Sequence, residues 1–206
     1  MLGGLAAGAK YVTSRRRPAS ALAATGAIRL FYGILFLMSI LLYRNYFFRA
    51  ESANKALGHY AVLTALAAVG YGTAALVTPI ATKRISMQAW ITTLLVAAAV
   101  ATGVLGAPFT QSAFLVLGFF LGLSGQGIAI CATTILQEDI SDDYRGRAFS
   151  FYDMTFNVLF VGGAAISAAF MPRTGRSGEL IAAVAIGYGV AAAGYWALTR
   201  RQPEPA

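Results

Sequence analysis

Residues 85–137 read ISMQAWITTLLVAAAVATGVLGAPFTQSAFLVLGFFLGLSGQGIAICATTILQ and contain no Asp, Glu, Lys or Arg. A helix needs roughly 20 apolar residues to cross the hydrocarbon core of a bilayer, so this stretch is long enough for two crossings. Its one polar interruption, residues 106–111, has the Gly and Pro content of a turn. Runs such as residues 94–100 lack the polar–apolar alternation typical of membrane β-barrels. The stretch therefore predicts two membrane-spanning helices joined by a short turn.

The composition of the whole chain agrees with a membrane protein. The 206 residues are 58% hydrophobic and 12% charged, with a mean hydropathy of +0.65. Soluble domains carry about twice this share of charge, so the composition argues against a soluble enzyme or a disordered tail. One Cys and one His cannot supply the ligand sets of metal hydrolases or redox enzymes. We therefore expect a protein without catalytic residues or cofactors, and without a phosphate-binding loop to drive it by ATP hydrolysis.

Further uncharged stretches on both sides raise the number of predicted spans to six, in an all-α polytopic helix bundle. Arg29 interrupts the first span, so its charge must be paired or must snorkel to the headgroups. The predicted spans are residues 20–46, 56–81, 88–106, 112–136, 147–170 and 179–199. They form a transmembrane domain of residues 19–199, between a cytoplasmic N-terminal loop of residues 1–18 and a cytoplasmic tail of residues 200–206.

The basic residues are distributed unequally between the two ends of this bundle. Ten lie at one predicted end: Lys10, Arg15, Arg16, Arg17, Lys83, Arg84, Arg145, Arg147, Arg200 and Arg201. Five lie at the other: Arg44, Arg49, Lys55, Arg173 and Arg176. The positive-inside rule places the richer end, with both termini, in the cytoplasm, as in a multi-pass protein of the plasma (inner) membrane. The net charge of +8 is thus a signal of topology. The bilayer is the expected partner, and nucleic acid is not.

Small residues recur within the predicted spans. Gly118 and Gly122 form a GxxxG pair in the fourth span, and Gly70, Gly162 and Gly163 lie in the second and fifth. Such residues let helix backbones approach closely in lipid. They favour a tightly packed monomeric bundle, with a dedicated dimerisation face as the alternative.

Residues 136–150, LQEDISDDYRGRAFS, carry the most specific pattern in the chain. They resemble the loop between the tenth and eleventh helices of major facilitator superfamily (MFS) transporters, especially bacterial drug-efflux-like members. Those loops have Leu-Gln, a few acidic residues, then Arg-Gly-Arg and a small residue. Glu138 and Arg145 match the spacing of Glu and Arg in sugar-porter relatives. Lys83 and Arg84 resemble a shortened copy of the family's basic loop between helices eight and nine, without its Asp and Gly.

This resemblance implies that the six spans correspond to helices seven to twelve, the C-terminal half of the fold, built as a 3+3 inverted repeat. The two halves of such transporters enclose the substrate near the bilayer midplane. The implied partners are therefore a small-molecule substrate and a second six-helix half, which is a separate chain, a missing N-terminal part or a second copy. The implied function is alternating-access transport, with efflux coupled to an ion gradient. The alternative is a non-transporting scaffold or assembly subunit, or a truncated remnant of a transporter.

Charged residues at the cytoplasmic end are candidates for a gate network: Lys83, Arg84, Glu138, Arg145 and Arg147. Glu138 would bridge to Lys83, Arg84 or Arg145 and hold the inner gate closed. A network of weak ion pairs that breaks in one state can bias a two-state equilibrium.

The same loop also has the pattern of a helix start. Ser141 would cap the helix, and Asp142 and Asp143 would suit the positive end of its dipole. Asp143 and Arg147 are four residues apart and would pair along the helix.

Polar residues within the spans are candidates for substrate or proton binding: Arg29, Gln126, Asp153 and Asn157. Asp153 and Asn157 lie four residues apart, on one face of a helix. Asp153 would be a protonatable group that changes partners, or a residue near the interface paired with Arg147 or Arg84. Arg29 would bind an anionic substrate, pair with Asp153, or snorkel.

Overall fold

A computed structural model describes residues 2–48 and 53–200. Within these residues all regular secondary structure is helical, and there is no strand. The helices are α1 (Leu2–Thr13), α2 (Arg16–Leu41), the π-helix η1 (Leu42–Phe47), α3 (Ala53–Thr82), α4 (Met87–Gly106), α5 (Gln111–Asp139), α6 (Asp142–Phe170) and α7 (Gly178–Thr199). Six of them, with α2 and η1 taken as one, are long and apolar enough to cross a membrane. The all-α helix bundle predicted from the sequence is confirmed.

The N-terminal segment differs from the loop expected over residues 1–18. Residues 2–13 form α1, and the hydroxyls of Thr13 and Ser14 close its end by donating to the carbonyls of Ala9 and Tyr11. The chain then turns into α2, which begins at Arg16, earlier than the predicted span. Pro18 fits there because the first turn of a helix has no use for its missing N–H.

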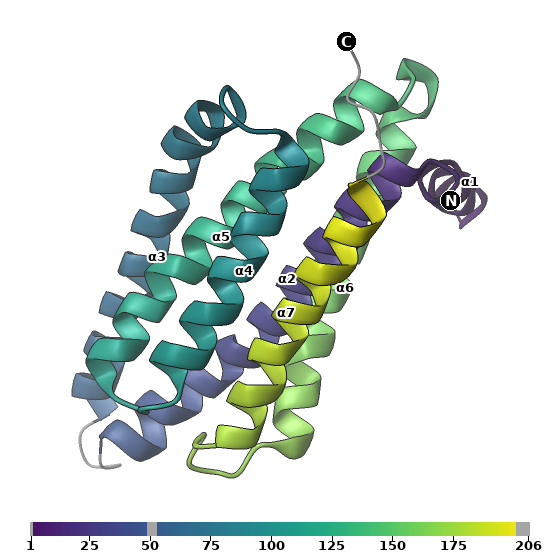
Figure 1. The fold of residues 1–206 in the computed structure, drawn as a ribbon. Coiled ribbons are helices and arrows are strands. Elements are labelled where there is room, and N and C mark those ends of the chain that lie inside the picture. Colours follow the sequence, from purple (N-terminus) through teal and green to yellow (C-terminus); the bar gives the residue numbers. More distant parts are fainter. Residues whose placement is uncertain (1, 49–52, 201–206) are drawn as a thin grey trace.

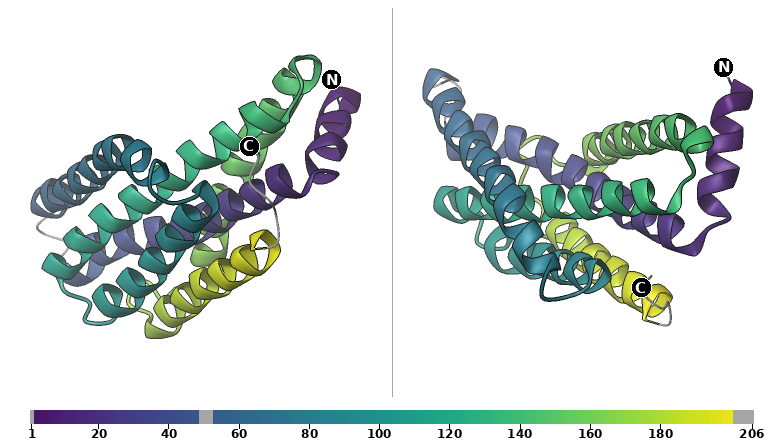
Figure 2. Two further views of the ribbon diagram at one scale, coloured as in Figure 1. Left: turned by 45° about the horizontal axis from the view of Figure 1, so that its top comes forward. Right: turned by 90° about the horizontal axis from the view of Figure 1, so that it is seen from above.

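The spanning helices form two layers. In one layer α6, α2, α5 and α3 lie side by side in that order. In the second, α4 packs on α5 and α7 packs on α2, and α4 and α7 contact each other. Figure 2 (right) shows α6 and α7 on opposite sides of α2. No long helix in the described ranges covers the face of the first layer that points away from α4 and α7.

The two ends of the bundle differ as the charge distribution predicted. Figure 1 shows α1, the α3–α4 turn, the α5–α6 turn and the end of α7 together at one end of the molecule. The basic residues assigned to the richer end lie in these segments or in the adjoining starts of α2 and α6. Arg201 is the exception and lies outside the described residues, as does Arg49 of the opposite end.

Helices α2 and α6 touch through their backbones. A Cβ atom added to Gly33 of α2 would collide with the carbonyl oxygen of Phe160 on α6. One added to Gly163 of α6 would collide with the carbonyl oxygen of Leu30 on α2. Each helix therefore presents a glycine to the main chain of the other, and only glycine permits this approach.

Helices α3 and α5 repeat this arrangement. A Cβ on Gly70 of α3 would collide with the carbonyl oxygen of Phe119, and one on Gly122 of α5 with that of Ala67. Gly118, one turn before Gly122, also faces α3. The GxxxG pair thus packs helices within the chain, as the monomeric interpretation predicted.

Gly163 and its neighbour Gly162 provide a matched test of this packing. No neighbouring atom lies within 4 Å of a Cβ added to Gly162. We expect Gly163→Ala to lower the free energy of unfolding by about 1–3 kcal/mol, the usual cost of overpacking. Gly162→Ala should leave it unchanged or raise it by up to about 1 kcal/mol, because alanine favours helix. Thermal unfolding of both variants in detergent measures the difference, and equal stabilities would contradict the backbone contact.

Candidate functional site

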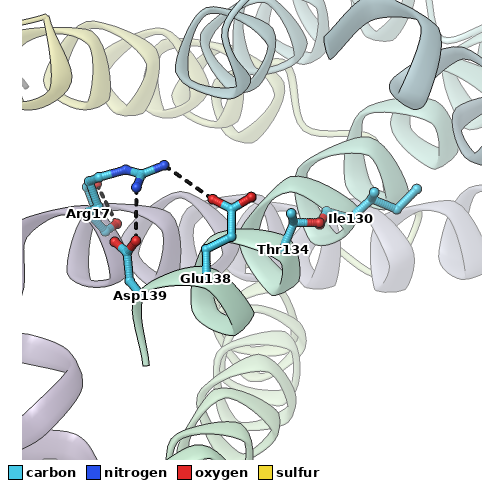
Figure 3. A network of polar contacts seen from close by, with 6 residues as sticks. Arg17, Ile130, Thr134, Glu138 and Asp139 are labelled. Carbon is cyan, nitrogen blue, oxygen red and sulfur yellow. Dashed lines mark hydrogen bonds and ion pairs between the residues drawn. The ribbon is translucent and has the colours of Figure 1, made fainter. Parts of the chain in front are cut away.

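An arginine at the start of α2 joins two carboxylates at the end of α5. Arg17 Nη1 lies 2.9 Å from Asp139 Oδ1, and its Nη2 lies 3.6 Å from Glu138 Oε2. Figure 3 shows the guanidinium reaching toward both carboxylates. The side chains of Arg17 and Asp139 are 15% and 20% exposed, so solvent screens this pair less than a surface pair. The cluster joins the start of α2 to the end of α5.

Arg15 adds a second contact to the same end of α5. Its Nη1 donates to the backbone carbonyl of Asp139 at 2.6 Å, where the last turn of a helix has no internal donor. The guanidinium of Arg15 also lies 4.6 Å from the ring centroid of Tyr11. The junction between α1 and α2 is thereby fixed to the end of α5.

The partner predicted for Glu138 is different in the structure. Glu138 pairs with Arg17, and no ion pair among the described residues joins it to Lys83, Arg84 or Arg145. Lys83 and Arg84 are exposed on the turn between α3 and α4. Arg145 binds Asp142 at 2.7 Å, one turn earlier on its own helix. Arg17 reaches Glu138 because α2 packs directly beside α5.

The start of α6 also departs from prediction in its side-chain contacts. Ser141 is the N-cap residue, and Asp142 and Asp143 occupy the first turn, as expected. The Ser141 hydroxyl, however, makes no capping bond and lies 3.2 Å from the Tyr11 hydroxyl. Arg147 lies over the ring of Tyr144 at 5.7 Å and forms no ion pair with Asp143.

Helix α1 supplies the reason for these changes. The rings of Tyr11 and Tyr144 stack with their centroids 4.4 Å apart, and Gly8 lies against the backbone of Arg147. The hydrogen bond with Ser141, together with the charge of Arg15, lowers the pKa of the Tyr11 phenol. Docking of α1 therefore gives the Ser141 hydroxyl a partner outside α6 and places Tyr144, the ring that Arg147 contacts, against Tyr11.

The Arg17 cluster can be tested against its neighbour Arg16, which is exposed. We expect Arg17→Gln to lower the free energy of unfolding by about 1–2 kcal/mol, because it leaves the partly buried Asp139 and the exposed Glu138 without their cation. Arg16→Gln should change it by less than about 0.5 kcal/mol. Chemical unfolding in detergent compares the two variants. An equal effect would show that the cluster contributes no more than surface charge.

Arg29 lies in the middle of α2 and packs against α6. It follows the start of α2 at Arg16 by 13 residues, or about 20 Å. Its Cζ lies 3.4 Å from the ring centroid of Phe156 on α6, and its Nε is buried without a hydrogen-bond partner. No ion pair among the described residues joins Arg29 to Asp153 or to any other carboxylate.

The remaining intramembrane candidates lie apart from Arg29. Asp153 and Asn157 are exposed on α6, where the Asn157 amide donates to the backbone carbonyl of Asp153 at 2.8 Å. The Asp153 carboxylate forms none of the ion pairs predicted with Arg147 or Arg84. Gln126 is half-buried on α5. Asp153 and Asn157 thus share a face of their helix, and the proton-binding role of Asp153 stays a prediction.

A groove that the sequence did not predict lies between α2, α3 and α5. It has a volume of about 270 Å³, and two hydroxyl side chains, Ser39 and Thr64, line it among apolar residues. Its aromatic lining consists of Tyr32, Phe36, Tyr60, Tyr71 and Phe114. The spacing of Arg29, Tyr32 and Phe36 was a signal for it, because residues at i, i+3 and i+7 share one helix face.

Comparison with known proteins identifies two relatives, while no family model and no solved structure matches the chain. The relatives are the uncharacterized MFS-type transporters Rv0037c of Mycobacterium tuberculosis and Mb0038c of Mycobacterium bovis. Each is 31% identical to this chain over 170 residues, which is 82% of the chain and 38% of the relative. The chain is therefore homologous to MFS-type transporters, as residues 136–150 indicated, and spans less than half the length of these relatives.

Proposed function

We propose that this homologue of MFS-type transporters is the C-terminal six-helix half of a secondary transporter, which moves a small molecule by alternating access. The observation that carries the proposal is similarity to such transporters over 82% of a chain that has six helices able to cross a membrane. Because the chain spans 38% of each relative, a second six-helix unit is part of the proposal. That unit is a separate chain, the rest of a longer protein or a second copy.

The glycine contacts support an inverted repeat of three helices and three helices. If the first three spans (α2, α3 and α4) are matched in order with the last three (α5, α6 and α7), then α2 corresponds to α5 and α3 corresponds to α6. The α2–α6 pair therefore corresponds to the α5–α3 pair. Gly33 and Gly163 then take the places of Gly122 and Gly70. Each of the four helices offers one carbonyl oxygen to the glycine of its partner helix. In every case this carbonyl belongs to the residue three positions before the helix's own contact glycine. A shared contact in the same register is what two copies of one structural unit would give.

The uncovered face of the layer formed by α6, α2, α5 and α3 is where we place the second unit. Large apolar side chains on the two outer helices of this layer are exposed, among them Leu57 and Leu76 of α3 and Val158 and Val161 of α6. Asp153 is exposed on α6 as well. A charged residue within a spanning helix is expected to face protein or water and not lipid, which supports this placement.

The charged clusters at the cytoplasmic end suit a gate. Arg17 holds the ends of α2 and α5 together, and Arg145 and Arg147 lie at the start of the neighbouring α6. Lys83 and Arg84 are exposed and unpaired among the described residues, so they are free to meet the second unit. We assign this end to the cytoplasm of a plasma-membrane protein, because it is the richer in Lys and Arg.

A chimera tests the transport function. This chain would be joined to the part of the Mycobacterium tuberculosis relative that it does not match, and expressed in cells loaded with fluorescent substrates of different charge. We expect at least one substrate to leave the cells faster with the chimera than with either part alone, and a protonophore to abolish the difference. A stable chimera at the membrane without flux of any substrate would favour the non-transporting alternative.

Asp153 tests the coupling in the same chimera. Asp153→Asn should reduce gradient-driven flux at least tenfold without changing protein abundance, since the amide cannot exchange a proton. Asp143→Asn, the same change in the first turn of α6, serves as the control and should retain flux. Unchanged flux in Asp153→Asn would exclude this residue as the proton site.

A further inference from the structure

The charge of Arg29 lacks a counter-ion in the described structure. Burying a cation at this depth of a bilayer is unfavourable unless it is paired. The ring of Phe156 covers one face of the guanidinium, which compensates part of that cost. The Nε–H is buried without an acceptor, and no ion pair among the described residues includes Arg29. The guanidinium therefore retains the capacity to bind an anion.

The groups around Arg29 are phenols. Its charge acts on the hydroxyls of Tyr32, Tyr152 and Tyr188, which come from three different helices. The Tyr188 hydroxyl donates to the backbone carbonyl of Ile28, whereas the Tyr152 hydroxyl is buried and has the side chain of Thr25 beside it. A neutral phenol can donate a hydrogen bond to an anion. Phenol hydroxyls around a cation suit an anionic group, although the carboxylate of Asp153 also acts on the Tyr152 hydroxyl.

The aromatic groove begins one turn further along the same face of α2. Tyr32 and Phe36 line the groove, and both also pack against Phe160 of α6, with ring centroids 6.0 and 5.3 Å away. Phe156, whose ring contacts the Arg29 guanidinium, lies one turn before Phe160. The cation and the apolar groove are thus neighbouring parts of one surface. A ligand with a charged head and a ring-containing body would contact both.

From this arrangement we propose that the substrate of the transporter is an amphiphilic organic anion, whose acidic group binds Arg29 and whose apolar body occupies the groove between α2, α3 and α5. The identification as a substrate rests on the proposed transport function. Binding itself does not, because every residue of the site belongs to this chain.

Binding of naphthalene-2-sulfonate tests the site directly. The full chain would be placed in nanodiscs of phosphatidylcholine, with empty nanodiscs as the blank, and binding measured by equilibrium dialysis. We expect the sulfonate to bind at least tenfold more tightly than 2-naphthyltrimethylammonium, which has a similar body and the opposite charge. Arg29→Gln should remove this preference, while Arg44→Gln, at the exposed end of the same spanning helix, should retain it. Equal binding of both probes, or unchanged affinity in Arg29→Gln, would overturn the proposal.

Two further variants keep the test decisive if Arg29→Gln does not fold. Arg29→Lys preserves the charge and should retain the preference for the sulfonate. Phe36→Ala shortens the aromatic wall and should lower sulfonate affinity at least fivefold. Loss of the preference in Arg29→Lys, or full affinity in Phe36→Ala, would contradict the assignment.

Anionic lipid is the other source of this chemistry, and a second set of nanodiscs separates it. If phosphatidylglycerol in the discs leaves sulfonate affinity unchanged, the site selects soluble anions, as proposed. If it abolishes binding by competition, the occupant is a lipid headgroup and the proposal fails. Sulfonate binding by a chain whose chimera shows no flux would refute transport but leave the binding site in place.

Discussion

Helices in a bilayer are surrounded by lipid as apolar as their own side chains, so they associate through close packing and not through hydrophobic burial. In this chain the closest packing occurs where α2 meets α6 and where α3 meets α5. Each contact places a glycine of one helix against a carbonyl of the other, reciprocally. These two pairs set the spacing of the first layer, and α4 and α7 pack behind it. The uncovered face and the groove both follow from that spacing.

Two arginines on α2 illustrate how position decides the chemistry of a charge. Arg17, at the start of α2, contacts two carboxylates, and its cluster joins two helices. Arg29, about 18 Å further along the helix axis, has an aromatic ring and hydroxyl groups instead of a counter-ion. The first is therefore a structural tie between two helices. The second has an incomplete environment that a ligand can complete.

The sequence predicted the six spans because hydropathy depends on each segment alone, and residues 136–150 indicated the family. It did not predict which charges would meet, since this depends on which helices lie side by side. Glu138 pairs with Arg17 because α2 adjoins α5. The sequence pattern, in contrast, indicated only that Arg17 belongs to the end of the bundle that is richer in basic residues. Likewise, Ser141 contacts Tyr11 because residues 2–13 form a helix that packs against α6. No local pattern in residues 136–150 reveals that neighbour.

Arg29 and Asp153 lie on neighbouring helices but do not form an ion pair. The two helices run in the same direction. The glycine contacts set Gly33 beside Phe160 and Gly163 beside Leu30, so Asp153 lies nearer the start of the helix pair than Arg29 does. A permanent ion pair between them would stabilise the α2–α6 contact and neutralise both charges. Instead the glycines hold these helices together, Arg29 contacts Phe156, and Asp153 is exposed on α6. Packing without charge leaves one cation for an anionic ligand and one carboxylate for the second unit or a proton.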